Sequence, residues 1–274
     1  SLGTLESIDK ISIDDLKSWY ERCFSPKVTR VLVAGNVTED QVLAAMKPFL
    51  LEWKAKDITF NNYPVPPAPE KSAIYFADIP GSRQSVIYIG YPAISRSNPD
   101  FVKVNFINYR LGGAYTSILN QILREQKGFT YGASCYFQEM KGIAPFIAAS
   151  SVRSDATFES VKIFKDEMGK FRNGLSDSDL QFVKNCILRS DALRFETDDA
   201  LVGMLSTMSK YGLPEDYIKQ EDNVIRNMTT EDSKAIADKY INPDKMYYVV
   251  VGDAATQVKP LEKIGFGQPI LLQK

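Results

Sequence analysis

An internal repeat is the feature that most constrains the fold of this chain. When the sequence is shifted by 217 residues, its beginning aligns with its end without a gap. Five positions are identical in the two copies, namely Asp15 and Asp232, Lys17 and Lys234, Pro26 and Pro243, Val33 and Val250, and Gly35 and Gly252. A helix cap, a proline, an apolar strand and a glycine turn recur in the same order, which is typical of a duplicated unit. The repeat predicts two copies of one domain, of which the first is incomplete.

A proline-rich segment separates the two copies. Residues 57–70 contain four of the fourteen prolines, and this composition favours the extended geometry of a stiff linker. We therefore predict that residues 1–56 are the C-terminal part of a preceding domain and that residues 71–274 are a complete copy of the same domain. The chain begins with Ser1 instead of Met, which predicts that it is a piece of a longer product.

The spacing of apolar residues predicts a mixture of strands and helices. Ser12 and Asp15 resemble a capping box in front of an apolar helical face. Strands are predicted over residues 28–34, 72–77, 84–91, 130–137, 144–152 and 246–251. Helices are predicted over residues 101–111, 115–125 and 156–173, and after the capping segments that begin at residues 12, 38, 176 and 229. This pattern indicates an α+β fold with a mostly antiparallel sheet and helices packed on one face.

The composition excludes several classes of function. The chain contains no histidine, which excludes Ser-His and Cys-His nucleophile pairs and every zinc site with a histidine ligand. Its three cysteines form no CxxC motif, so neither a disulfide framework nor a thiolate zinc site is predicted. A net charge of −1 argues against nucleic-acid binding by bulk charge. No apolar run approaches the ~18 to 20 residues that span a bilayer. The bacterial periplasm and the cytoplasm are both compatible with this sequence.

One segment stands out for its motif. Residues 111–132 read Leu-Gly-Gly-Ala-Tyr-Thr-Ser-Ile-Leu-Asn-Gln-Ile-Leu-Arg-Glu-Gln-Lys-Gly-Phe-Thr-Tyr-Gly, a Gly-Gly turn, an amphipathic helix and a strand that begins with Tyr-Gly. This segment resembles the C-terminal-type domains of the peptidase M16 family, which includes pitrilysin, insulin-degrading enzyme and mitochondrial processing peptidase. Residues 80–85, residues 174–180 with Asp179 in place of Glu, and residues 2–36 are similar to further parts of that family. The resemblance implies an M16 (LuxS/MPP-like) metallopeptidase-type domain.

The resemblance also implies a role in catalysis. In that family a zinc-binding His-x-x-Glu-His helix and a distal Glu lie in one domain. A different domain faces them across a closed chamber and supplies an Arg and a Tyr seven residues apart. Arg124 and Tyr131 match that pair in type and spacing. The match implies that Tyr131 donates to the oxyanion of a peptide under attack, and that Arg124 holds a substrate carbonyl or positions Tyr131.

The missing histidine decides which cofactors and partners are expected. No cofactor is predicted in this chain, and zinc is expected in a His-bearing M16 domain or subunit, in the same polypeptide or in another one. A peptide substrate is the second predicted partner, paired backbone to backbone with a sheet edge. Neither a nucleic acid nor a membrane span is predicted. The chain by itself is predicted to be inactive.

Other interpretations of the same residues stay open. Arg124 near a helix C-terminus stabilises the helix dipole by roughly 0.3 to 1 kcal/mol without any further role, and a tyrosine such as Tyr131 that opens a strand is often a packing residue. M16-like chains also occur as non-catalytic scaffolding, similar to the core subunits of respiratory complexes, and a plain peptide-binding module is a third possibility. The acidic runs at residues 39–40 and 196–199 lack the spacing of a hard-cation loop. The glycines at residues 112–113 are interpreted as turn residues.

Overall fold

The chain divides into two compact units. The computed structural model describes residues 3–61, 63–190 and 195–273. The sheet unit comprises the described residues of 65–191 and 213–274, and the N-terminal unit comprises those of 1–64 and 192–212. Residues 198–211 belong to the N-terminal unit although they are far from it in the sequence.

The sheet unit is built on one six-stranded sheet. Its strands are β1 (Ala73–Asp78), β2 (Gln84–Ile94), β3 (Thr130–Phe137), β4 (Ala144–Arg153), β5 (Tyr247–Gly252) and β6 (Ile270–Leu271). The strand order is β3-β4-β2-β5-β1-β6. The pairs β3–β4, β4–β2 and β2–β5 are antiparallel, whereas β5–β1 and β1–β6 are parallel. The α+β fold class predicted from the sequence is therefore confirmed.

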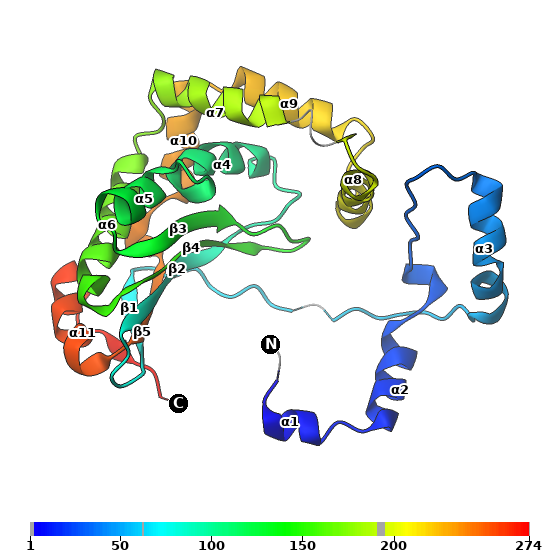
Figure 1. Cartoon of the computed structure of the whole chain (residues 1–274), viewed down its shortest axis with the longest axis horizontal. Helices are drawn as coiled ribbons and strands as arrows, with labels where there is room; N and C mark the ends of the chain where they lie inside the picture. The colour runs from blue at the N-terminus through cyan, green and yellow to red at the C-terminus, as the bar shows by residue number, and fades with distance from the viewer. Residues whose placement is uncertain (1–2, 62, 191–194, 274) are drawn as a thin grey trace. The chain divides into compact units, whose positions relative to one another are not determined.

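Helices and helical turns of the sheet unit pack on one face of the sheet (Figure 1). In chain order they are α4 (Phe101–Asn108), η2 (Tyr109–Gly113), α5 (Ile118–Asn120), η3 (Gln121–Gln126), η4 (Ser154–Ala156), α6 (Thr157–Phe171), α7 (Asp177–Ser190), α9 (Tyr217–Asn227), α10 (Thr230–Tyr240), η6 (Pro243–Lys245), α11 (Ala254–Leu261) and η7 (Glu262–Ile264). In β5, Tyr248 and Val250 are buried while Tyr247 and Val249 are only half-buried, because alternate side chains point to opposite faces of a strand. The largest buried side chains on the covered face include Phe76, Phe106, Phe146, Phe164 and Tyr248.

Two of the predicted helices are interrupted by π-helical turns. The helix predicted over residues 101–111 is α4 followed by η2, and the helix predicted over 115–125 is the short α5 followed by η3. Turns of this kind are rare, and in them the regular i→i−4 hydrogen bonds of an α-helix are replaced by wider ones. Both lie against β3, which indicates that the packing on this strand reshapes the helices.

Gly112 lies where the η2 turn approaches β3. A Cβ at this position would lie 2.4 Å from Sγ and 2.6 Å from the backbone nitrogen of Cys135. Gly112 belongs to the η2 turn, but it has no positive φ, so its backbone conformation does not require a glycine. The glycine is needed because only a residue without a side chain allows the two backbones to come this close.

The N-terminal unit contains helices but no strand among its described residues. Its elements are α1 (Leu5–Asp9), α2 (Ile13–Cys23), η1 (Pro26–Val28), α3 (Glu39–Glu52) and α8 (Asp198–Tyr211). None of its four α-helices has a buried residue. Ser25 is buried and links two segments, because its hydroxyl donates to the Lys56 carbonyl oxygen at 2.6 Å and accepts from the Lys56 nitrogen at 3.0 Å.

The strand predicted over residues 28–34 is not formed. Val28 ends the η1 turn, and residues 29–34 pair with no strand among the described residues. A strand persists only when neighbouring strands satisfy its backbone N–H and C=O groups, and the described part of the chain offers these residues no such neighbour. The apolar pattern of these residues was recognised correctly, but the pairing that would make it a strand is absent.

We expect Gly112→Ala to lower the free energy of unfolding by about 1–3 kcal/mol, because the added methyl group overlaps β3 and the backbones must separate. Gly142→Ala is the matched control, since nothing lies within 4 Å of a Cβ at that position. The control should change stability by no more than about 0.5 kcal/mol. Urea unfolding of both variants measures the difference, and equal stability of the two would contradict the close approach.

The pH dependence of stability should reveal the ion pair that joins α4 to α10. The carboxylate of Asp100 accepts from Nζ of Lys239 at 2.7 Å and from the hydroxyl of Tyr240 at 2.8 Å. The Lys239 hydrogen bond, assisted by Tyr240, lowers the pKa of Asp100. The stabilisation is therefore present above the unfolded-state pKa of about 3.9 and is lost as the pH falls through the lower folded-state pKa. We expect Asp100→Asn to lower the urea midpoint at pH 7 and to lose this effect in strong acid; a pH-independent difference would argue against the ion pair.

Candidate functional site

Tyr131 lies on a β-bulge at an edge of the sheet. Thr130 pairs with Val152 and Ala133 pairs with Ser150, so two residues of β3 face one residue of β4. A bulge bends the strand locally and can turn a side chain away from its regular direction. Tyr131 is 92% exposed, and no hydrogen bond to its hydroxyl is present in the part of the chain that the structure describes. The phenol is therefore free to meet a ligand.

Hydroxyl groups hold the bulge in place. The Thr130 hydroxyl donates to the Ser151 carbonyl oxygen at 2.6 Å and accepts from the Gly132 nitrogen at 3.0 Å. The Ser150 hydroxyl donates to the Gly132 carbonyl oxygen at 2.9 Å. These bonds satisfy backbone groups that the regular ladder leaves unpaired at a bulge. Tyr131 thus projects from a fixed backbone.

Arg124 lies over an aromatic ring at the end of the preceding helical segment. Its guanidinium carbon is 4.8 Å from the centroid of Tyr115, a distance suited to a cation–π contact. Its Nε is 3.4 Å from a carboxylate oxygen of Glu125, which also accepts from the Tyr115 hydroxyl at 3.0 Å. Tyr115 and Glu125 therefore restrict the guanidinium while leaving it partly exposed to solvent.

The buried side chain of Asn120 bonds to a neighbour of each candidate residue. Its amide nitrogen donates to the Tyr115 carbonyl oxygen at 2.7 Å, and its amide oxygen accepts from the Ala133 nitrogen at 3.1 Å. One amide thus bridges the residue beneath Arg124 and the residue that ends the bulge of Tyr131. No hydrogen bond or cation–π contact joins Arg124 directly to Tyr131 among the described residues. The sequence analysis identified the two end points but missed Asn120, Tyr115 and their link, although both lie inside the same motif.

Cys135 lies under this region but is not suited to chemistry. Its thiol is buried and donates to the Asn108 side-chain oxygen at 2.9 Å. Burial raises the pKa of the Cys135 thiol far above its usual range. A thiol that stays protonated is a poor nucleophile, so no reactive role is predicted for Cys135. Cys135 lines a cavity of about 330 Å³ together with Tyr109 and Gly113, and no reactive role is predicted for this cavity either.

The sheet face opposite to the helices of the sheet unit is apolar and rich in tyrosine. A cavity of about 360 Å³ on this face is lined by Tyr88, Ile147, Tyr247 and Val249, together with Pro66. These side chains alternate with the buried ones of the same strands and project to the opposite face. The sheet unit therefore combines an apolar face with an edge strand that carries an exposed phenol.

The side chains of this chain do not fit a zinc site of the histidine type. The sequence has no histidine, and in residues 3–61, 63–190 and 195–273 no three cysteine or acidic residues gather in a way that could hold a metal ion. Arg124 and Tyr131 supply hydrogen-bond donors but no metal ligand of the kind that zinc prefers. Within the same described ranges, no helix is long and apolar enough to cross a bilayer.

Comparison with known proteins gives consistent results. The family model of the peptidase M16 inactive domain matches residues 10–186, more than half of the chain. The chain is 24% identical over 260 residues to the non-peptidase homolog YmxG of Helicobacter pylori, which covers 92% of this chain and 58% of that protein. It is 23% identical over 249 residues to the uncharacterized zinc protease SCO5738 of Streptomyces coelicolor, with 86% of this chain and 52% of that protein covered.

A solved structure agrees with these sequence matches. The crystal structure of a peptidase M16 inactive domain from Pseudomonas fluorescens aligns with a TM-score of 0.76 at 25% identity, covering 92% of this chain and 60% of that chain. The present chain therefore spans between about half and three fifths of the length of these three relatives.

We expect Asn120→Ala to lower the free energy of unfolding by about 1–3 kcal/mol, because the Tyr115 carbonyl and the Ala133 amide would lose a buried partner. Asn185→Ala is the control, since Asn185 is exposed in α7 and should change stability by at most about 0.5 kcal/mol. Urea denaturation measures both effects. If Asn120→Ala were as stable as the control variant, the two hydrogen bonds of the Asn120 side chain would not contribute to the free energy of unfolding.

Proposed function

We propose a function from the premise that this chain belongs to the peptidase M16 family, whose inactive-domain model it matches over residues 10–186. The resemblance expected from residues 111–132 is confirmed by this match. In our proposal the sheet unit forms one wall of a peptide-binding chamber and supplies Arg124 and Tyr131 to peptide hydrolysis. The zinc and its histidine ligands belong to a His-bearing M16 half, in the same polypeptide or in a partner.

The observation that carries this proposal is the presentation of Tyr131. The residue is 92% exposed and lies on a bulge of an edge strand that is held by hydrogen bonds. The end of this bulge, at Ala133, is linked through Asn120 to Tyr115, on whose ring Arg124 lies. A packing residue would be expected to bury most of its ring instead. A hydrogen-bond donor without a partner among the described residues, held on a fixed backbone, is suited to stabilise negative charge on a substrate oxygen.

The two residues divide the binding task. The Tyr131 hydroxyl donates a hydrogen bond to the carbonyl oxygen of the bound peptide and binds it more strongly as negative charge develops there. Arg124 carries a permanent positive charge and a planar set of donors, which suits a second carbonyl oxygen or a carboxylate of the substrate. Neither residue activates water by itself, so the chemical step requires the His-bearing half.

Edge strand β3 supports a peptide-binding role. The strand pairs with β4 on one side, and no described strand pairs with its other side. An extended peptide can add to such an edge through main-chain hydrogen bonds, which tolerate many side chains. We propose that the substrate adds here, where the bulge of Tyr131 interrupts the otherwise regular edge.

A scaffolding role is the second candidate. The relative from Helicobacter pylori carries the name non-peptidase homolog, which favours a function without hydrolysis. In that case the chain would contribute a surface to a larger assembly, and Arg124 and Tyr131 would have no catalytic use. A stable complex without affinity for peptides, detected by pull-down and peptide titration, would favour this second candidate.

We expect Tyr131→Phe to reduce peptide cleavage when the chain is combined with its His-bearing half. Loss of one donor to a developing oxyanion lowers kcat by about 100- to 1,000-fold, while the Michaelis constant changes little. Tyr63→Phe is the control, because Tyr63 is also highly exposed but lies in the proline-rich segment. Equal rates for wild type and Tyr131→Phe would exclude the role assigned to Tyr131.

A further inference from the structure

A missing side chain hollows the sheet face opposite to the helices. Along β2 alternate residues point to this face, and Gly90 stands between Tyr88 and Pro92. Gly90 pairs with Ile147 of β4 and with Tyr247 of β5, so four side chains surround a position that has none. A Cβ at Gly90 would lie 2.2 Å from a backbone carbonyl oxygen of β4. The pairing of the two strands therefore keeps this position empty.

The resulting tyrosine hollow is the cavity of about 360 Å³ that Tyr88, Ile147, Tyr247, Val249 and Pro66 line. Its volume falls within the range of about 300–1,000 Å³ that is typical of ligand pockets. None of the described residues that line the hollow is charged. Aromatic rings and aliphatic groups form its walls, so it favours an uncharged, apolar occupant.

Part of the chain's own proline-rich segment lies at the rim of the tyrosine hollow. Pro66 is one of the lining residues, and the hydroxyl of Tyr247 donates to the Pro67 carbonyl oxygen at 3.3 Å. Grooves lined by aromatic side chains are the usual binding sites for extended proline-rich peptides. The segment at the rim therefore indicates what kind of ligand this face takes: an extended peptide with apolar rings or side chains.

The proline-rich segment is firmly held at one end and lightly held at the other. Ser72 is buried, and its hydroxyl forms two hydrogen bonds of 2.9 Å to backbone groups at and after η6. Pro69 is buried as well, whereas Pro66 and Pro67 are exposed. The hydrogen bond to Pro67, at 3.3 Å, is long for a hydroxyl donor. Pro66 and Pro67 can therefore leave the hollow while the buried end stays in place.

We infer that the tyrosine hollow is a binding site for an extended peptide segment that carries proline or another compact apolar side chain, and that Pro66 occupies its rim until such a segment displaces it. The apolar side chain of the bound peptide enters over Gly90. The Tyr247 hydroxyl bonds to a backbone carbonyl of the peptide, as it does to that of Pro67. Only the identification of this peptide as the substrate rests on the proposed function.

The tyrosine hollow lies on the same sheet face as the bulge of β3. Residues 131 and 132 are opposite Ser151, which is exposed, while its two neighbours in β4 are buried toward the helices. Ser151 and Ile147 are four residues apart in β4, which places the hollow about 13 Å along the strand from the bulge. One extended peptide can reach both places, so the hollow would select side chains several residues away from the carbonyl at Tyr131.

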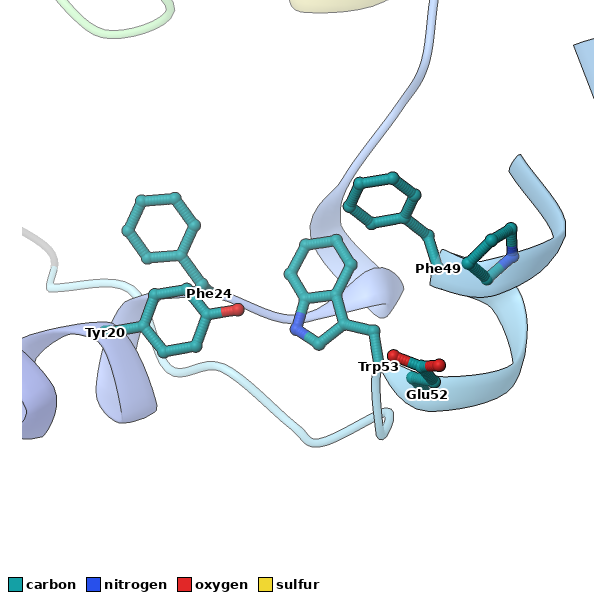
Figure 2. A pocket seen from close by; sticks show the side chains of 6 residues that line it. Tyr20, Phe24, Phe49, Glu52 and Trp53 are labelled. Atoms are coloured by element: carbon teal, nitrogen blue, oxygen red, sulfur yellow. The ribbon is translucent and has the colours of Figure 1, made fainter. Parts of the chain in front are cut away.

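A second apolar cavity offers such a peptide another place to bind. Figure 2 shows the rings of Tyr20, Phe24, Phe49 and Trp53 around a cavity of about 400 Å³ in the N-terminal unit. The repeat predicts that residues 1–56 belong to an incomplete copy of the domain, which accounts for these rings as core residues of that copy. The tyrosine hollow lies in the copy that is predicted to be complete, so this account does not apply to it.

Fluorescence polarisation of a labelled peptide tests the inference on the full chain without any cleavage assay. The probe is a synthetic peptide with the sequence of residues 63–69, Tyr-Pro-Val-Pro-Pro-Ala-Pro. The reference peptide has serine at its four proline positions. We expect the proline peptide to bind at least about tenfold more tightly than the serine peptide, because its rings leave water when they enter the hollow.

Variants in the hollow and at its rim should act in opposite directions. Ile147→Glu places a carboxylate in the wall and should weaken binding of the proline peptide at least about tenfold. Val251→Glu is the matched control, since Val251 is half-buried on the same face but is not among the described residues that line the hollow. The double variant Pro66→Gly with Pro67→Gly frees the rim and should strengthen binding about threefold or more. Pro64→Gly, outside the sheet unit, should leave the affinity unchanged.

Three more variants locate the probe. Tyr88→Ser removes one wall of the hollow and should weaken binding as Ile147→Glu does. Tyr88 is 48% exposed, so this variant should fold, and urea unfolding checks that it does. Trp53→Ser opens the cavity of Figure 2 instead and should leave the affinity unchanged. Tyr131→Phe should also bind the probe as the wild type does, which keeps this test separate from that of the catalytic proposal.

Equal binding of the proline and serine peptides would overturn the inference. So would weaker binding in Trp53→Ser together with unchanged binding in Tyr88→Ser, because the peptide would then lie in the N-terminal unit. Weaker binding in the double glycine variant would contradict the displacement of Pro66, and equal weakening by Ile147→Glu and Val251→Glu would contradict a site confined to the hollow.

Discussion

Backbone pairing is the constraint on which both units depend. A strand needs neighbours that satisfy its N–H and C=O groups, and its side chains are buried only when those neighbours also carry a covering layer. β5 has both neighbours, and the core of the sheet unit forms around it. Residues 30–35 have a comparable apolar pattern and neither neighbour, so they form no strand among the described residues. The same pattern thus has two outcomes, decided by what surrounds it.

The candidate site arises where regular structure is interrupted. Two π-helical turns lie against β3, Gly112 permits their close approach, and β3 itself bulges at Tyr131. Each irregularity leaves backbone N–H and C=O groups without their usual partners, and nearby polar side chains form hydrogen bonds to these groups instead. Asn120 is the clearest case, since one amide bonds to both sides of the motif. The result is a phenol and a guanidinium that project from a backbone held by polar contacts.

Local signals in the sequence predicted much of the fold. The capping residues Ser12 and Thr229 start helices where expected, and the strands of the sheet unit follow their apolar alternation, because both features depend on residues close in sequence. The strand predicted over residues 28–34 was wrong because pairing is not a local property. The bulge, the π-helical turns and the role of Asn120 depend on how β3 packs against residues 109–126, which no spacing rule reveals. The motif located Arg124 and Tyr131, and their proposed roles come from the family resemblance.

The place of β5 in the sheet has a consequence for how the protein is made. β5 lies inside the sheet between β2 and β1, yet both of these strands precede it by a long stretch of chain. β1 and β2 leave the ribosome some 150 residues earlier and cannot be bridged until residues 247–252 emerge. During that interval the growing polypeptide carries two unpaired strand edges, which are the features most prone to aggregation in a nascent chain. The sheet can therefore close only once residues 247–252 have been synthesised, and the demand for chaperones should last until that point.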